Sequence, residues 1–250
     1  KREWNRFDIN DMVIEILKKL IELGSRKHHI FSAVYLDEIQ DFSYAMIYLI
    51  CSIGGTSNLR WVFAGDTAQM ISPGCSFKFS GLKQTLLSIR PGIEPYLKQV
   101  SHLLVNYRTT KDVLQLGNAV LAKAKEHFPG AIEFARKEQA VNDFGLKVVL
   151  NDWDSALATK PSFGKDQALI YSFSKDHEDS CTSLKHWLGD HPFILSALDS
   201  KGLEFDDVVV AFDLDRACWK VESQGPVALN MLRELYVAIT RAKRRVVILV

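Results

Sequence analysis

An apolar stretch that ends in two adjacent carboxylates constrains this chain more than any other feature. Residues 31–36 read Phe-Ser-Ala-Val-Tyr-Leu, and Asp37 and Glu38 follow directly. An apolar run of this length is typical of a buried parallel strand. Because open α/β sheets bind ligands beyond the carboxyl ends of their strands, the pattern predicts that both carboxylates lie at a ligand-binding edge. A solvated strand end is the alternative that this stretch alone leaves open.

Adjacent carboxylates at a strand end suit one kind of chemistry in particular. In enzymes that transfer phosphoryl groups, a strand-end aspartate helps to hold Mg²⁺. A neighbouring carboxylate can orient or deprotonate the attacking water. The stretch therefore makes Asp37 a candidate metal ligand and Glu38 a candidate general base.

Strand-like and helix-like segments alternate along the rest of the chain. We expect strands at residues 31–36, 59–64, 100–105, 147–150, 168–173, 193–195, 208–212 and 245–250. We expect helices at residues 8–24, 43–51, 82–89, 176–188 and 226–240, and a further helix capped by Thr109 or Thr110. This alternation predicts an α/β fold of parallel sheets in two domains, residues 1–97 and 98–250. Residues 126–165 are expected to form only a short insertion.

Composition excludes several classes of protein. The 250 residues are 47% hydrophobic and 24% charged, as in ordinary globular proteins, and the net charge of +1 gives no overall basic field for nucleic acid. The four cysteines lack metal-ligand spacing, which favours reduced thiols in an intracellular protein of the nucleus or cytoplasm. No segment is long and apolar enough to cross a membrane. Both ends are expected to be cuts within a longer polypeptide.

Polar residues gather where the expected strands and helices end. The first half supplies Asp37, Glu38, Asp66 and Gln69, and the second supplies Tyr107, Arg108, Lys201, Glu204 and Arg241. Phosphoryl transfer needs such a mixture of carboxylates, a water-positioning group and arginines. For Arg241 alone, a cation favoured by a helix C-terminus is the stronger interpretation. Phe77 and Phe79 are candidates for stacking on a base, with anchoring of their loop in a core as the favoured alternative.

Five short motifs, in order, resemble those of the UvrD/Rep-like helicases of superfamily 1. They read DEIQD, GDTAQ, NYRT, SKGLEFDDV and LRELYVAITRAK, and they fall between residues 31 and 246. The stretch GDTAQMI…GCSFKFSGL, with FDIND upstream, is most similar to the large eukaryotic members that carry TPR and ankyrin repeats. The resemblance implies two RecA-like domains of the P-loop NTPase type, the first incomplete at its N-terminus, that bind ATP, Mg²⁺ and single-stranded nucleic acid.

The resemblance also implies a role for each motif residue. The residues implied to be catalytic are Asp37 as metal ligand, Glu38 as base, Gln69 as sensor of the γ-phosphate, and Arg108 and Arg241 as arginine fingers. Those implied to bind nucleotide are Tyr107 on adenine, Glu204 on ribose, and Gly202 in the same motif. Those implied to contact nucleic acid are Ser196 and Ser200, and a stacking platform for a base would have to use Phe77 or Phe79.

Four departures from the family pattern weaken parts of this picture. No GxxxxGK[ST] occurs in the sequence, so that loop is expected upstream of Lys1. Ser196 and Leu198 stand where the family usually has Thr and His. Ser72, Gly74 and Cys75 stand where it has an aromatic residue and an arginine. The 126–165 segment is too short for the accessory domain that the family inserts there.

These observations predict an ATP-dependent helicase or translocase motor core, truncated here and without ATPase activity as these residues alone. A degenerate module that binds RNA or protein without hydrolysis is the alternative. The net charge, the substituted fifth motif and the missing phosphate loop favour that alternative. The five catalytic candidates argue against it.

Overall fold

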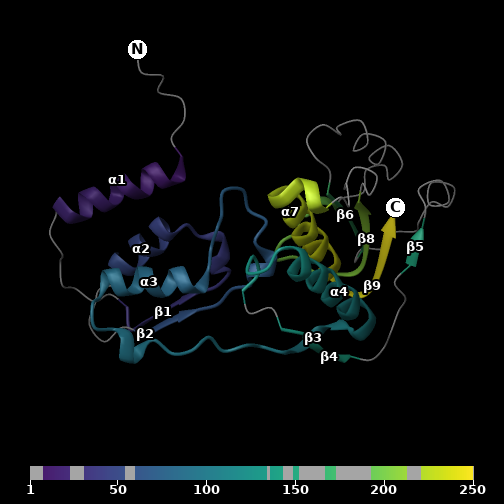
Figure 1. Ribbon diagram of the computed structural model, residues 1–250, viewed down its shortest axis with the longest axis horizontal. Helices are drawn as coiled ribbons and strands as arrows, with labels where there is room; N and C mark the ends of the chain where they lie inside the picture. Colours follow the sequence, from purple (N-terminus) through teal and green to yellow (C-terminus); the bar gives the residue numbers. More distant parts are fainter. Residues whose placement is uncertain are drawn as a thin grey trace, which may run out of the picture. The chain divides into compact units, whose positions relative to one another are not determined.

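The structure is a computed structural model. It describes residues 8–22, 31–53, 60–133, 136–142, 149–151, 167–172, 193–212 and 221–249. The chain divides into two compact units, Lys1–Ser101 and His102–Val250. The boundary predicted from sequence lay after residue 97. Figure 1 shows the elements of each unit along the chain. The expected helix at residues 176–188 falls outside the described residues.

The first unit contains a small parallel sheet covered by helices. Strands β1 (Ala33–Leu36) and β2 (Arg60–Phe63) pair in parallel, with Ala33 opposite Arg60 and Leu36 opposite Phe63. Helices α2 (Tyr44–Ile53) and α3 (Phe79–Ile89) pack against each other, and α1 (Ile9–Glu22) packs against α2. Figure 1 shows α2 and α3 on the same side of the two strands. The parallel βαβ arrangement expected for residues 31–64 is therefore confirmed.

An apolar cluster lies at the centre of the described part of the first unit. Its buried members are Ile39, Ile47, Cys51, Met70, Phe77, Leu82 and Leu86. Helix α2 starts as predicted after Ser43, whose Oγ accepts a hydrogen bond from Met46 N at 3.3 Å. The Tyr44 hydroxyl accepts from Lys78 N at 2.8 Å and donates to Lys78 O at 3.1 Å, which ties α2 to the start of α3. Burial raises the pKa of the Cys51 thiol to about 12, so this thiol stays protonated at neutral pH.

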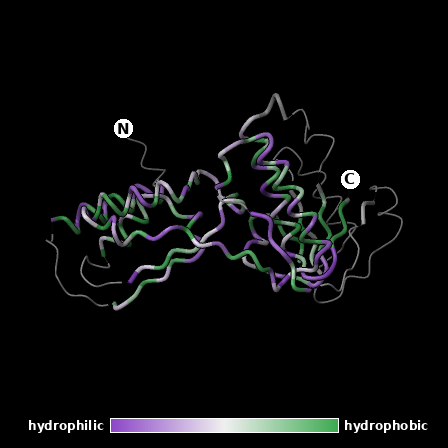
Figure 2. The backbone as a smooth tube through the Cα atoms, turned by 60° about the horizontal axis from the view of Figure 1, so that its bottom comes forward, coloured by the Kyte–Doolittle hydropathy of each residue, from purple (hydrophilic) through white to green (hydrophobic). Residues whose placement is uncertain are grey.

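The second unit is built on a five-stranded parallel sheet. Its strand order is β5-β9-β8-β6-β7. The strands are β5 (Val149–Asn151), β6 (Gln167–Ser172), β7 (Ile194–Ser196), β8 (Phe205–Phe212) and β9 (Ala242–Leu249). Figure 2 shows the last part of β9, beside the C label, in the green of hydrophobic residues. Because a parallel strand with both faces covered is apolar along its length, this pattern made the strand recognisable from sequence.

Two helices of the second unit pack closely together beside the sheet. Helix α4 (Lys111–His127) contacts α7 (Val221–Thr240), and the two run side by side in Figure 1. The contact passes over Gly117, where an added Cβ would lie 3.5 Å from the Tyr236 ring. Gly225 breaks α7 with φ 41° and ψ −113°, so the regular helix starts at Pro226, as predicted.

The third expected strand was placed too early. The structure puts β3 at Val105–Thr110, paired in parallel with β4 (Gln139–Asn142), whereas the sequence pattern favoured residues 100–105. Leu103 is 94% exposed, so the apolar run before β3 finds no covering layer. The strand is fixed further along because Thr109 Oγ1 donates to Ala242 O at 3.3 Å and Thr110 Oγ1 to Arg244 O at 3.4 Å. These bonds to β9 are not visible in local hydrophobicity.

Candidate functional site

The polar residues of the first unit meet at the carboxyl ends of its two strands. Ala64 N donates to Leu36 O at 2.8 Å, and Ile39 N donates to Ala64 O at 3.0 Å. These bonds extend the β1–β2 pairing one step beyond the strands. Asp37 and Glu38 therefore lie at the same edge of the sheet as Gly65 and Asp66, as the sequence predicted.

Asp37 and Glu38 form a tight turn at this edge. Both residues are exposed, and Asp37 Oδ1 accepts from Glu38 N at 2.9 Å. Glu38 has φ 52° and ψ 36°, and among the described residues no other residue except glycine has a positive φ. Left-handed backbone is unfavourable for a residue with a Cβ, by about 1 kcal/mol. It persists here because Ile39 and Gln40, which follow, are anchored in the core with 0% exposure.

The side chain of Gln40 bridges the two strand ends, a contact that sequence reasoning missed. Gln40 Nε2 donates a short hydrogen bond to Glu38 Oε2, and Gln40 Oε1 accepts from Asp66 N at 2.9 Å. Gly65 makes room for this amide, since an added Cβ would lie 2.5 Å from Gln40 Oε1 and 2.8 Å from Ile39 Cγ2. A polar residue directly after the apolar Ile39, two positions beyond Glu38, was the available clue.

Replacing Gly65 by alanine is expected to destabilise the first unit. The new methyl group overlaps the Gln40 amide and Ile39, and such overpacking costs about 1–3 kcal/mol. Hydrogen–deuterium exchange of peptides from β1 and β2 should show faster exchange in the variant. Gly117→Ala is the matched control, because its Cβ meets nothing closer than 3.5 Å and alanine favours a helix. Equal protection of β1 and β2 in Gly65→Ala and in the wild type would contradict the predicted overlap.

Gln69 and Asp66 lie in one loop after β2. Asp66 Oδ1 accepts from Ala68 N at 2.8 Å and so caps the short helix Thr67–Gln69. Gln69 Nε2 donates to Asp66 Oδ2 at 3.0 Å. The Gln69 amide therefore makes a hydrogen bond within its own loop. The role of Gln69 as a γ-phosphate sensor stays a prediction.

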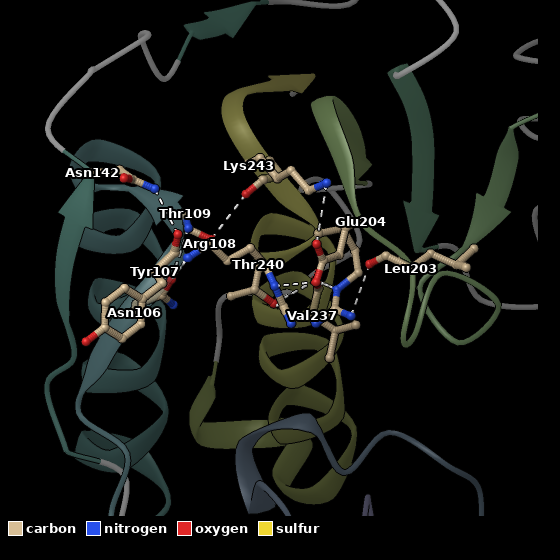
Figure 3. A network of polar contacts seen from close by, with 12 residues as sticks. Asn106, Tyr107, Arg108, Thr109, Asn142, Leu203, Glu204, Val237, Thr240 and Lys243 are labelled. Carbon is tan, nitrogen blue, oxygen red and sulfur yellow. Dashed lines mark hydrogen bonds and ion pairs between the residues drawn. The ribbon is translucent and has the colours of Figure 1, made fainter.

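In the second unit, one carboxylate joins two cations from different strands. Arg108 Nε lies 2.5 Å from Glu204 Oε1, and Lys243 Nζ lies 3.5 Å from Glu204 Oε2. Figure 3 shows both cations directed toward Glu204. Arg108 comes from β3 and Lys243 from β9, which the threonine bonds described above hold together. The structure therefore pairs two residues that sequence reasoning had assigned separately, and it adds Lys243, which that reasoning missed.

Arg241 is buried, with 2% of its surface exposed, where α7 ends. Its Nε donates to Val237 O at 3.1 Å, one NH group donates to Leu203 O at 3.4 Å, and the other donates to Thr240 Oγ1 at 3.3 Å. A cation bonded to a carbonyl of the last helical turn is the interpretation that sequence favoured for this residue alone. The finger role stays a prediction.

Tyr107 keeps an accessible ring. Its side chain is 73% exposed, and Figure 3 shows it directed away from Glu204. The backbone around it is held by Asn106 Oδ1, which accepts from Arg108 N and Thr109 N at 3.0 Å, and by Asn142 Nδ2, which donates to Tyr107 O at 2.8 Å. A fixed backbone with an exposed aromatic side chain can present that ring to a planar ligand.

Two of the four predicted nucleic-acid contacts need correction. Phe77 is 2% exposed and packs edge-on against Phe79 at 5.1 Å, so its ring anchors the core and cannot stack on a base. Ser200 is fully buried and donates to Ala197 O at 2.8 Å, so its hydroxyl cannot reach a ligand. Half-buried Phe79 stays a candidate.

Ser196 is the last residue of β7, and Gly202 lies in the loop that leads from β7 to Glu204. Ser196 Oγ donates to Asp199 Oδ2 at 2.6 Å, and it accepts from Asp199 N at 3.0 Å. The carboxylate beside it disfavours a phosphate at that hydroxyl. Gly202 has φ 80°, a conformation that suits glycine, so the turn itself explains its presence. The ligand roles of both residues stay predictions.

Two kinds of feature are absent from the described residues. No group of three or more His, Cys, Asp or Glu side chains there is arranged to hold a metal ion. No helix in the same ranges is long and apolar enough to cross a membrane.

Comparison with known proteins finds similarity to curated proteins by sequence and a more distant similarity to solved structures. No family model matches. The chain is 28% identical over 221 residues to human TPR and ankyrin repeat-containing protein 1. The matched region covers 82% of this chain but only 7% of the human protein. The Arterivirus nonstructural protein 10 helicase in complex with DNA has a TM-score of 0.45 at 18% identity, over 97% of this chain and 52% of that one. The PRRSV helicase has a TM-score of 0.44 at 15% identity, and the match covers 86% of this chain and 34% of that one. TM-scores below 0.5 do not establish a common fold.

Proposed function

We propose that these residues belong to the motor core of an ATP-dependent superfamily 1 helicase or translocase that acts on single-stranded nucleic acid. The observation that carries the proposal is the strand-end turn of Asp37 and Glu38, held beside Asp66 and Gln69 at the carboxyl edge of a parallel sheet. The five motifs, in order along the chain, support it.

The groups of the first unit suit the hydrolytic half of the reaction. Mg²⁺ prefers carboxylate oxygens and water, and Asp37 offers an exposed carboxylate for it. When bound, the ion would neutralise charge on the phosphates of ATP. Glu38 would orient the attacking water and take its proton, and Gln69 would bind near the γ-phosphate.

The groups of the second unit suit charge stabilisation and nucleotide binding. Arg108 and Arg241 would stabilise negative charge that develops on the transferred phosphoryl group. Tyr107 would stack on adenine with its exposed ring. Glu204 would bind ribose only if one of its two cations released an oxygen, since both oxygens are engaged.

A specific observation favours the second candidate, a non-hydrolysing module that binds RNA or protein. Both proposed arginine fingers already bind groups of this chain: Arg108 pairs with a carboxylate, and Arg241 donates to backbone carbonyls. A scaffold would keep such bonds permanently. A motor would have to exchange at least the Arg108–Glu204 pair for a phosphate in each cycle.

Nucleotide hydrolysis by the full-length protein separates the two candidates. We expect Mg²⁺-dependent ATP turnover that rises at least tenfold when single-stranded DNA or RNA is added and much less with blunt duplex. The measurement is release of inorganic phosphate at saturating ATP. ATP and strand binding without turnover would favour the scaffold, and absence of both would contradict the motor proposal.

A further inference from the structure

A buried amide lies next to the proposed base and has no role in the chemistry described so far. The side chain of Gln40 is fully buried within the first unit, in the short helix Ile39–Asp41 directly after the strand-end turn. Burying an amide is unfavourable unless its polar atoms are hydrogen-bonded, so a glutamine at such a position needs specific partners.

Both ends of this amide are used, and they serve different elements. The carbonyl oxygen accepts from Asp66 N at 2.9 Å, at the end of β2. The NH₂ group donates to Glu38 Oε2, at the end of β1. Gly65 lets the Gln40 amide approach the end of β2, because a Cβ at position 65 would lie only 2.5 Å from Gln40 Oε1.

The bond from Gln40 constrains the orientation of the Glu38 carboxylate. Its carboxylate is on an exposed side chain, and its backbone is in the left-handed region. An exposed glutamate samples several rotamers, and fixing one costs side-chain entropy. A buried donor bonded to one carboxylate oxygen restricts the rotamers that the Glu38 side chain can adopt. Loss of the correct orientation of a catalytic base can lower the reaction rate about 10²-fold.

We infer that Gln40 is a positioning residue: its amide holds the Glu38 carboxylate in the orientation in which Glu38 activates water, and it ties that orientation to the Asp66 end of β2. The inference rests on the proposed function, because it presumes that Glu38 acts on a water molecule. It also predicts that Gln40 has a second, separable role in stability through the bond to Asp66 N.

A double-mutant cycle in the full-length protein tests the inference. Gln40→Met keeps the length of the side chain and removes both hydrogen bonds. We expect kcat for ATP to fall 10- to 100-fold while KM for ATP changes less than about threefold, because the lost contact orients the base and does not bind nucleotide. Glu38→Asp withdraws the carboxylate from the amide without disturbing the core. In the Glu38→Asp background, Gln40→Met should lower kcat less than twofold further, since the bond is already broken.

Tyr44→Phe is the matched control. It removes two hydrogen bonds in the same unit, those to Lys78, without touching Glu38. Hydrogen–deuterium exchange should show looser packing in both Gln40→Met and Tyr44→Phe, while kcat falls only in the former. If Gln40→Met does not fold, Gln40→Asn takes its place, because its amide is one methylene too short to reach both partners.

Four results would overturn the inference. Unchanged kcat in Gln40→Met, a change in KM alone, an equal loss of kcat in Tyr44→Phe, or additive effects of Gln40→Met and Glu38→Asp would each do so. These results differ from failure of the proposed function, in which the wild-type protein itself shows no ATP turnover. Non-additive loss of kcat, together with intact kcat in Tyr44→Phe, supports the positioning role.

Discussion

Replacing Glu38 by glutamine in the full-length protein is expected to lower kcat for ATP about 10³-fold. The amide keeps the size of the side chain but cannot accept a proton from water, and a general base contributes about 10²- to 10⁴-fold to rate. Binding of ATP should change little, since Asp37 and not Glu38 is the proposed metal ligand. Phosphate release measures turnover, and equilibrium binding of a fluorescent ATP analogue measures affinity.

Glu94→Gln is the control for this substitution. It removes one exposed carboxylate of the same unit, far along the chain from the strand ends, and should leave turnover unchanged. Hydrogen–deuterium exchange of β1 and β2 should be unaltered in both variants, because an exposed carboxylate contributes little to packing. Turnover by Glu38→Gln at the wild-type rate would remove Glu38 from the mechanism, whatever the affinity for ATP.

The strand-end carboxylates were predictable because their cause is local. An apolar run followed by two acids specifies β1 and its end, and the parallel pairing then brings the β2 end to the same edge. The left-handed turn at Glu38 was not predictable, because it depends on Gln40 reaching Asp66 past Gly65. That contact joins segments whose separation in the sequence hides it.

The second unit shows the same division between local and distant causes. Helices α4 and α7 follow their apolar periodicity, and Thr110 and Pro226 mark their starts as expected. The predicted position of β3 was wrong because the strand is fixed by side-chain hydrogen bonds to β9 carbonyls and not by its own hydrophobicity. The pairing of Arg108 with Glu204 was likewise invisible, since each residue sits in its own motif and only the fold brings them together.

Replacing Arg241 by lysine is expected to have two effects of different size. The ammonium group cannot reproduce the planar set of bonds to Val237 O, Leu203 O and Thr240 Oγ1, so the free energy of unfolding should fall by about 1–3 kcal/mol. If Arg241 also stabilises the transferred phosphoryl group, kcat should fall about 10³-fold, since an arginine finger contributes at least that much. The ATP affinity should fall far less than kcat.

Arg244→Lys separates the catalytic effect from the structural one. Arg244 lies three residues further along the chain, and its guanidinium is largely exposed, 4.0 Å from Asp206. An exposed pair of this kind contributes about 0–1 kcal/mol, so this variant should keep both stability and turnover. For Arg241→Lys, kcat is measured at a temperature where hydrogen–deuterium exchange shows that α7 remains folded. A loss of kcat there, with α7 still protected, assigns Arg241 to catalysis. Wild-type kcat with weakened protection of α7 assigns it to the helix end alone, because a buried guanidinium bonded to backbone carbonyls stabilises that end whether or not a nucleotide is present.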